Sequence, residues 1–327
     1  MSKRGTLLLT FILTALICFG QDSSKDSFDV FQEFSPGSSV TSLTSANSMS
    51  SHNKAINSEW YWIGAVLLLT VLAGVFVRFK SLRSLRSLFL VGSIVVFGFY
   101  RSGCPCSIQS LQNNVLFLLN FQPRWPSLSL FLGLIPITYF FGRVYCGWIC
   151  HLGALQELIY TSSSTRLFQS NKSQKIMRYL RIAALVILIT QLIITRTNLY
   201  KNVDPFSVVF SFYSKYFIGW ALVVIIVGTS LLLFRPFCKT LCPVGLTLGW
   251  ISKIPGASVV GVKNECINCN LCTKTCNIRA ITRDSKLTVI ESQECIRCGQ
   301  CLDSCKKNAI NIFYNSRSHR SRTLVRT

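Results

Sequence analysis

Two cysteine runs near the C-terminal end of the chain constrain its structure and chemistry more than any other feature. Each run has the spacing C-x2-C-x2-C-x3-C, and the second repeats the first at an offset of 29 residues. Three cysteines spaced in this way can converge on one cubane cluster, while the fourth, on the following helix, ligates the other cluster. The runs therefore predict two [4Fe-4S] clusters, cluster 1 (Cys266, Cys269, Cys272 and Cys305) and cluster 2 (Cys295, Cys298, Cys301 and Cys276).

Zinc and disulfide bonds are the alternatives for these cysteines. Zinc ribbons pair two C-x2-C knuckles and do not need a third and a fourth cysteine in each run, so the spacing favours iron–sulfur clusters. Many cysteines in a short basic segment would also suit a disulfide-linked secreted domain. The topology predicted from the apolar segments places these cysteines in the reducing cytoplasm, which favours free thiolates.

The overall composition is that of an integral membrane protein. Of the 327 residues, 50% are hydrophobic and 14% are charged, which is rare among soluble oxidoreductases. The formal net charge of +22 arises from 34 lysines and arginines against 12 acidic residues. Because these cations flank apolar segments, we expect anionic membrane lipid as their partner. We expect no nucleic-acid partner, since no recognition helix accompanies the basic tail.

The N-terminal segment, 1–20, has the layout of a secretory signal peptide. Basic residues precede an apolar stretch over 7–17, and cleavage is expected after Gly20. Lipidation of Cys18 and an uncleaved signal anchor are the alternatives. Residues 21–58 are rich in serine and asparagine, so we expect a flexible extracytoplasmic segment.

The apolar segments between residues 59 and 249 predict about five membrane crossings. A crossing helix needs about 20 apolar residues. One predicted crossing is shorter, but it must cross if the flanking charges are to alternate. Segments 111–121 and 145–160 are candidates to lie along the membrane surface. The predicted crossings are 60–78, 88–100, 126–142, 182–196 and 216–234.

The distribution of basic residues predicts the orientation. Arginines and lysines are concentrated in the loops around 78–86 and 166–181, which are therefore expected in the cytoplasm. With the N-terminal segment exported, five crossings return the chain to the cytoplasm near Arg235. The cluster-binding domain, 250–314, and a basic tail, 315–327, follow on that side.

A smaller cysteine pattern occurs twice, where two predicted helices emerge on the same side of the membrane. Both copies read R-x-aromatic-C-x3-C-x-aliphatic-G, from Arg143 to Gly153 and from Arg235 to Gly245. In a helix, this spacing would place both thiols of a pair on one face. The four cysteines are candidates for a metal, a further cluster or redox-active thiol pairs, and simple packing is the alternative. They are Cys146, Cys150, Cys238 and Cys242.

A third cysteine site, Cys104-Pro105-Cys106, is predicted on the opposite, extracytoplasmic side. A C-x-C pair could bind a metal, form a strained disulfide or brace the turn. Haem is not expected. The segment from Cys146 to His151 has one residue too many between its cysteines for c-type attachment, and the chain has three histidines, too few near the spans for a dihaem site.

Together these features resemble the NapH/NosR-type membrane polyferredoxins, over roughly residues 60–312. The resemblance implies an α-helical polytopic membrane protein of the bacterial cytoplasmic (inner) membrane, with a C-terminal α+β domain of the two-cluster bacterial ferredoxin type. The chain departs from the family at three places. His151 stands where proline is usual, and Asn277 and Lys306 replace the prolines after the fourth cluster cysteines.

The resemblance also implies a respiratory role. Electrons would pass between quinol, or a cytoplasmic donor, and an extracytoplasmic reductase system, with the chain as an electron-transfer subunit of an oxidoreductase. We find no flavin-attachment motif and no recognisable quinone site. Quinone, the membrane cysteines or the cofactor of a partner subunit or flavoprotein must therefore bridge the roughly 30 Å membrane core. The alternative function is an assembly factor that reduces a metal or a disulfide of a metalloenzyme.

Overall fold

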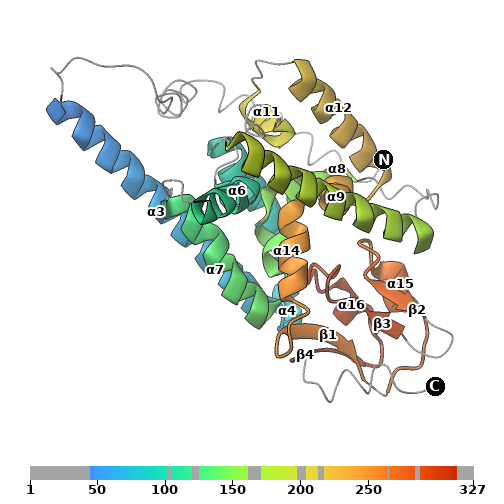
Figure 1. The fold of residues 1–327 in the computed structure, drawn as a ribbon. Helices are drawn as coiled ribbons and strands as arrows, with labels where there is room; N and C mark the ends of the chain where they lie inside the picture. The colour runs from blue at the N-terminus through green and yellow to red at the C-terminus, as the bar shows by residue number, and fades with distance from the viewer. Residues whose placement is uncertain are drawn as a thin grey trace. The chain divides into compact units, whose positions relative to one another are not determined.

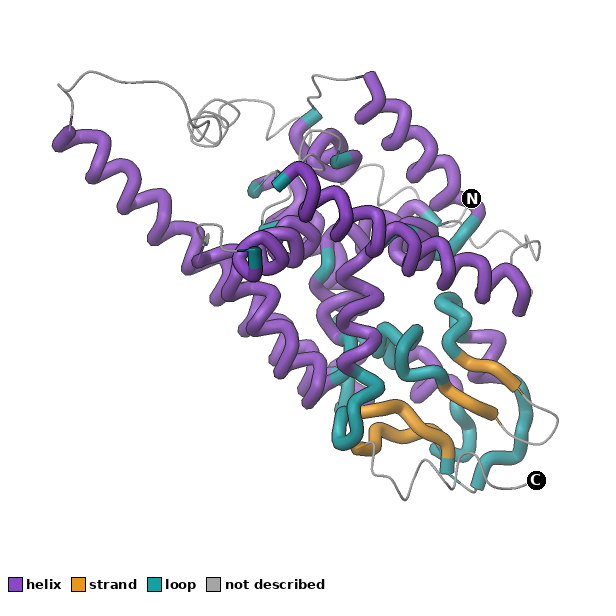
Figure 2. Tube along the Cα trace, viewed as in Figure 1, coloured by secondary structure: helices purple, strands orange, loops and turns teal. Residues whose placement is uncertain are grey.

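The structure of the chain is a computed structural model that consists of helices followed by two small sheets (Figures 1 and 2). The chain separates into two units, Met1–His52 and Asn53–Thr327. The predicted signal peptide, Cys104 and the basic tail lie outside the described residues. The structure describes residues 45–101, 105–119, 125–160, 171–196, 204–212, 217–263, 265–283 and 288–314.

The helical part of the chain coincides with the predicted crossings. Three helical segments are long and apolar enough to cross a membrane, namely Ser58–Phe76, Lys80–Tyr100 and Ser173–Thr195. Two further apolar helices, Trp125–Phe141 and Phe217–Leu232, are shorter. Each predicted crossing therefore falls on a helix, while the count of five stays a prediction. The helices of this part are α3 (Ser45–Phe76), α4 (Lys80–Arg83), α5 (Arg86–Ser93), η1 (Ile94–Tyr100), α6 (Ser107–Leu118), α7 (Trp125–Phe141), η2 (Tyr145–Ile149), α8 (His151–Ile159), α9 (Asn171–Thr195), α11 (Pro205–Ser211), α12 (Phe217–Leu232), α13 (Pro236–Thr240) and α14 (Pro243–Ile251).

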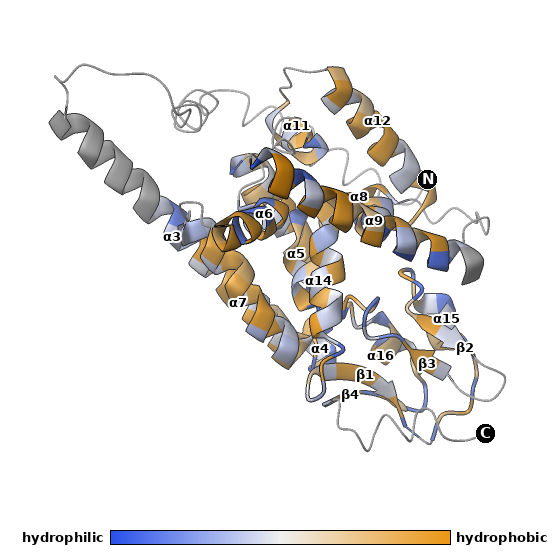
Figure 3. Ribbon diagram, viewed as in Figure 1, coloured by the Kyte–Doolittle hydropathy of each residue, from blue (hydrophilic) through white to orange (hydrophobic). Residues whose placement is uncertain are grey.

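Large apolar side chains point outward from the long helices. Leu68 on α3, Ile187 on α9 and Val224 on α12 are 62%, 68% and 69% exposed, and Figure 3 shows apolar residues along α9 and α12. Apolar surface in water costs roughly 25 cal/mol per Å², and contiguous exposed apolar faces mark contact with a membrane or a partner. With helices of membrane-spanning length, this surface identifies a membrane protein.

Helix α6 packs into the helical core, whereas the sequence suggested that the segment 111–121 lies along the membrane surface. The helix contacts α7, α9 and α14, and its polar residues Ser110, Gln112 and Asn113 are buried. The Ser110 hydroxyl accepts a hydrogen bond from the Phe131 amide (3.1 Å). Buried polar groups are tolerated when they find such partners. The polar side of α6 is therefore buried in the protein and does not face the membrane surface.

The C-terminal domain combines two antiparallel strand pairs with two short helices. Strand β1 (Ser258–Val262) pairs with β4 (Ile310–Tyr314), and β2 (Ile281–Arg283) pairs with β3 (Thr288–Ile290). Helices α15 (Leu271–Thr275) and α16 (Gln300–Ser304) contact each other. Each of these helices carries the third cysteine of one run.

The backbone of this domain repeats in the same way as its sequence. Residues with positive φ occur in pairs separated by 29 positions, Asn268 with Arg297 and Asn270 with Gly299. Asn270 and Gly299 occupy the N-cap positions of α15 and α16. The internal repeat predicted from the cysteine spacing is therefore also present in the turns that carry the cysteines.

Candidate iron–sulfur sites

The cysteines of the two runs lie in loops and short helices of the C-terminal domain. Burial, together with the thiols of Cys298 and Cys295, raises the pKa of Cys276 to about 11. Cys276 therefore lies within electrostatic range of the second run, although it belongs to the first. The assignments of Cys276 to cluster 2 and of Cys305 to cluster 1 both stay predictions.

A single metal ion is a different case from a cubane cluster. Among the described residues, no group of three or more histidine, cysteine or acidic side chains is arranged to hold one metal ion. In a cubane, four thiolates bind four different iron atoms and do not converge on one point. The absence of a single-ion site among the described residues therefore does not bear on a cubane cluster.

The first C-x3-C motif interrupts a helix at its second cysteine. Cys146 lies in the π-helix η2, whereas Cys150 has an extended backbone and immediately precedes α8. The Cys150 amide donates to the Tyr145 carbonyl at 2.9 Å. This bond spans five residues and makes a wider turn than an α-helix. The two cysteines therefore do not lie in one continuous α-helix, which was the condition for placing both thiols on one helix face.

The second C-x3-C motif has the same construction. Cys238 lies in the short helix α13, and Cys242 has an extended backbone and precedes α14. The Cys242 amide donates to the Phe237 carbonyl at 3.0 Å. The Cys242 thiol accepts a hydrogen bond from the Gly245 amide (3.4 Å), so the first turn of α14 points a backbone donor at the sulfur.

The four motif cysteines line one pocket. Its space outside the atoms is about 540 Å³, part of it open to solvent. Burial and the thiols of Cys238 and Cys146 raise the pKa of Cys150 to about 12, so thiols from both motifs lie within electrostatic range. The structure thus brings together two cysteine pairs that lie 92 residues apart in the sequence. We call this space the four-cysteine pocket; its charged lining residues are Arg143, Arg181, Arg235, Lys239 and Glu294.

The arginine that opens each motif packs against the glycine that closes the other. A Cβ atom on Gly245 would lie 3.0 Å from Nη2 of Arg143, and one on Gly153 would lie 2.7 Å from Nη1 of Arg235. Both arginines are buried, at 3% and 1% exposure. The repeated glycines therefore leave room for two guanidinium groups beside the pocket. The arginine of each motif occupies the space that the glycine of the other motif leaves free.

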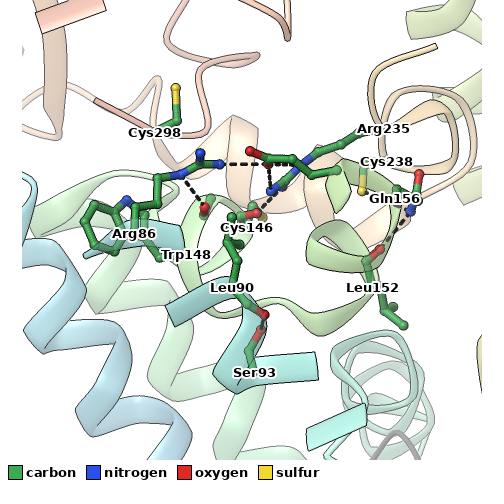
Figure 4. A network of polar contacts seen from close by, with 12 residues as sticks. Arg86, Leu90, Ser93, Cys146, Trp148, Leu152, Gln156, Arg235, Cys238 and Cys298 are labelled. Atoms are coloured by element: carbon green, nitrogen blue, oxygen red, sulfur yellow. Dashed lines mark hydrogen bonds and ion pairs between the residues drawn. The ribbon is translucent and has the colours of Figure 1, made fainter. Parts of the chain in front are cut away.

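A largely buried carboxylate, that of Glu157 with 13% of its side chain exposed, holds Arg235 in place. Glu157 Oε2 accepts from Arg86 Nη2 at 2.7 Å and from Arg235 Nε at 3.0 Å, while Arg235 also donates to the Cys146 carbonyl. Figure 4 shows Arg86 and Arg235 on two sides of this shared acceptor, with Cys298 above Arg86 in the view. One acidic side chain thus links Arg86, which lies within electrostatic range of the predicted cluster 2 ligand Cys298, to the four-cysteine pocket.

The loop that carries the predicted ligands of cluster 2 is bound to the first C-x3-C motif. Trp148 Nε1 donates to the Arg297 carbonyl at 3.0 Å, and Arg143 Nη1 donates to the Gln293 carbonyl. A Cβ atom on Gly147 would clash with the Ile296 carbonyl. These contacts fix residues on both sides of Cys295 against the helix ends.

Cys106, the described cysteine of the C-x-C site, is close to the four-cysteine pocket, whereas the sequence suggested that the two sites lie on opposite sides of the membrane. Ser107, which follows Cys106, lines the pocket. Burial raises the pKa of Tyr145, and the thiols of Cys150 and Cys106 contribute to the increase. Tyr145 therefore has thiols of both sites within electrostatic range. The inward packing of α6, which begins after Cys106, accounts for the difference.

Sequence reasoning missed two polar residues beside the pocket. Gln156 donates to Cys238 Sγ at 3.7 Å and accepts from the Phe237 amide at 3.1 Å. Glu157 could have been found, since Glu157 and Asp204 are the acidic residues between positions 60 and 249. An acid so isolated in an apolar region is expected to pair with a buried cation.

Two family models match the chain at these sites. A 4Fe-4S binding domain matches residues 123–169 and 217–260, which include both C-x3-C motifs. A 4Fe-4S dicluster domain matches residues 265–310, which include both cysteine runs. The resemblance to NapH/NosR-type membrane polyferredoxins is confirmed. The chain carries ferredoxin-type 4Fe-4S domains and is similar to electron-transfer and regulatory proteins of respiratory systems.

Named relatives align with parts of this chain. Regulatory protein NosR of Pseudomonas aeruginosa is 28% identical over 241 residues, 65% of this chain and 32% of that protein. Ferredoxin-type protein NapH of Haemophilus influenzae is 28% identical over 143 residues, 41% and 47% of the two chains. An uncharacterized protein of Methanocaldococcus jannaschii is 31% identical over 152 residues, 44% and 62% of the two chains. The chain thus spans less than two thirds of each of these relatives, and no solved structure matches it.

Proposed function

We propose that the chain is a membrane-bound iron–sulfur protein that relays single electrons between quinol, or a cytoplasmic donor, and an extracytoplasmic respiratory reductase system. The names of the relatives NapH and NosR support a place in such a system. An intermediate carrier is then required, namely quinone, the membrane cysteines or the cofactor of a partner subunit, because a cytoplasmic domain cannot reach an acceptor across a membrane core of roughly 30 Å.

One observation carries the relay. Glu294 and Ile296, on both sides of Cys295, line the four-cysteine pocket, as does Ile278, two residues after Cys276. Two predicted ligands of cluster 2 are thus next to residues that form the pocket wall. We infer the order cluster 1, cluster 2, four-cysteine pocket, with electrons moving in either direction along it.

The residues of the four-cysteine pocket fit a further iron–sulfur cluster. Four thiols from two motifs supply the ligand number that a cubane needs. Arg143 and Arg235, buried beside the pocket, would offset the negative charge of four thiolates. Such a cluster would supply one-electron transfer. Cys146, Cys150, Cys238 and Cys242 would hold it beside the two helix breaks, and Trp148 and Arg143 bind the loop around Cys295 to the first motif.

The topology is part of the proposal. Five crossings with the basic loops on the inside place the C-terminal domain in the cytoplasm and the protein in the bacterial inner membrane. The cations of the loop around residues 78–86 would then also contact lipid headgroups. Cysteine labelling from each side of intact and inverted membrane vesicles tests this orientation.

Redox cycling in native membranes tests the function. Membranes that contain the chain are reduced anaerobically with quinol, and the clusters are followed by low-temperature EPR before and after the respiratory acceptor is added. A relay predicts that the clusters are reduced and then reoxidised within the turnover time of the acceptor enzyme. Clusters that stay reduced, together with an acceptor enzyme that keeps full activity after the chain is removed, would contradict a relay and indicate an assembly factor.

A further inference from the structure

The two clusters differ in what covers them. On the cluster 2 side, Arg83 forms an ion pair with Asp303 (2.7 Å), and Trp148 binds the Arg297 carbonyl. On the cluster 1 side, Cys269 is exposed, in contrast to the other described cysteines. Ile267, between Cys266 and Cys269, is 62% exposed. Cluster 1 is therefore the one that a second protein can approach.

Exposed lysines lie in the segments that carry the predicted cluster 1 cysteines. The Lys263 amide donates to the Ala309 carbonyl at 2.7 Å, and the Cys266 amide donates to the Lys263 carbonyl at 3.2 Å. The Asn308 amide donates to the Cys305 carbonyl at 3.1 Å and closes the turn between them. These bonds bring the β1 end, the first cluster cysteine and the 305–308 turn together. The cluster 1 face, as we define it, consists of the exposed residues Lys263, Ile267, Cys269, Lys274, Lys306 and Lys307.

The charge of this face is strongly one-sided. It carries four lysines; in the described part of these segments the exposed acids are Glu265 and Asp303, and Asp303 is paired with Arg83. Transient redox complexes are small, and complementary charge raises their rate of encounter. An exposed apolar residue ringed by charge suits such an encounter, because it excludes water over the point where the electron crosses.

We propose that the cluster 1 face binds a soluble, acidic one-electron carrier protein. The proposal rests on the proposed relay function and names its cytoplasmic partner class. In the reducing direction, one electron leaves the reduced centre of the carrier and enters cluster 1, and the oxidised carrier dissociates. No bond is made or broken. Lipid headgroups are the other occupant that four exposed lysines could attract, and the vesicle measurement below tests them.

Stopped-flow reduction of the full chain tests the proposal. The chain is placed in nanodiscs of uncharged phosphatidylcholine and mixed with a reduced bacterial ferredoxin of net negative charge. Reversing two charges, with Lys306→Glu and Lys307→Glu, should lower the second-order rate about tenfold or more at roughly 50 mM salt. The difference should shrink at roughly 500 mM salt, where the Debye length is a few ångströms.

A matched control separates the face from general charge effects. Lys175→Glu reverses an exposed charge on α9, and it should leave the rate within about twofold of the unmodified chain. EPR of the reduced variants checks that both clusters are assembled. The proposal is overturned if the double variant and the control react alike. It is also overturned if the double variant keeps its reduction rate and loses affinity for vesicles of anionic lipid, which would make the face a lipid contact.

The same sample distinguishes this proposal from the relay itself. Quinol is offered in place of ferredoxin, and the clusters are followed in the same way. Reduction by quinol without any reduction by ferredoxin rejects the acidic carrier and leaves the relay standing. Rapid reduction by ferredoxin that depends on Lys306 and Lys307 supports the acidic carrier even where the acceptor test of the relay fails.

Discussion

Replacing Glu157 by glutamine should destabilise the helical part of the protein strongly. The carboxylate faces two guanidinium groups, those of Arg86 and Arg235, which are 8% and 1% exposed. Burial acts to raise the pKa of Glu157, but the two arginines outweigh it, so the pKa lies below its usual value. Glutamine keeps the shape and removes the charge, which leaves two buried cations without compensation.

The magnitude follows from the cost of breaking a buried ion pair. Removing one partner typically costs about 3–5 kcal/mol. Since 1 kcal/mol shifts the melting temperature of a 150–250-residue domain by about 2–4 °C, the expected loss is roughly 6–20 °C. Apparent melting temperatures in detergent, taken at one scan rate, provide the measurement. Because the pKa of Glu157 is depressed in the folded state, its stabilisation is fully present above the unfolded-state pKa of about 4.3 and is lost progressively as the pH falls from there through the lower folded-state pKa. The difference between the variant and the unmodified chain should therefore be constant from about pH 6 to pH 8.

Glu291→Gln is the matched control. Its carboxylate pairs with Arg178 at 2.6 Å, but the two side chains are 32% and 33% exposed. A partly solvated pair contributes about 0–1 kcal/mol, so this variant should lose at most about 4 °C. Equal shifts for the two variants would refute the reasoning, because burial would then not determine the cost.

Two further variants test the packing and the ligand assignment. Gly147→Ala should displace the cluster 2 loop, since its Cβ would meet the Ile296 carbonyl, and such overpacking costs about 1–3 kcal/mol. Gly92→Ala is the control, because its Cβ would have nothing within 4 Å. The EPR signal of cluster 2 should change in Gly147→Ala and not in Gly92→Ala. Cys276→Ser should remove or convert cluster 2 and spare cluster 1, because Cys276 lies near Cys298 and Cys295; loss of the cluster 1 signal in redox-titrated EPR would show that the ligand exchange is misassigned.

The cysteine chemistry was readable from the sequence because spacing encodes it locally. A C-x2-C-x2-C-x3-C run fixes which thiols share a loop, and the repeat at 29 residues reappears in the positive-φ pairs of the backbone. The apolar segments likewise located the helices, since length and hydropathy are local properties. The match of both cysteine runs to one dicluster domain follows from the same signal.

The architecture around the four-cysteine pocket could not be read in this way. Arg143 packs against Gly245, and Arg235 against Gly153, which are contacts between motifs far apart in the chain. The helix breaks at Cys150 and Cys242 depend on tertiary packing, and no residue in the motif marks them alone. Ser107 reaches the pocket because α6 folds inward, and a polar helix with buried hydrogen-bond partners looks amphipathic in sequence.

Iron and acid-labile sulfide analysis of the anaerobically purified chain tests the central claim, that two ferredoxin-type clusters adjoin a third group in the four-cysteine pocket. The account predicts about twelve iron atoms per chain, falling to about eight in a variant with Cys146→Ser and Cys238→Ser that keeps both ferredoxin EPR signals. About eight iron atoms in both proteins would contradict the third group. Zinc in place of iron would contradict the whole account.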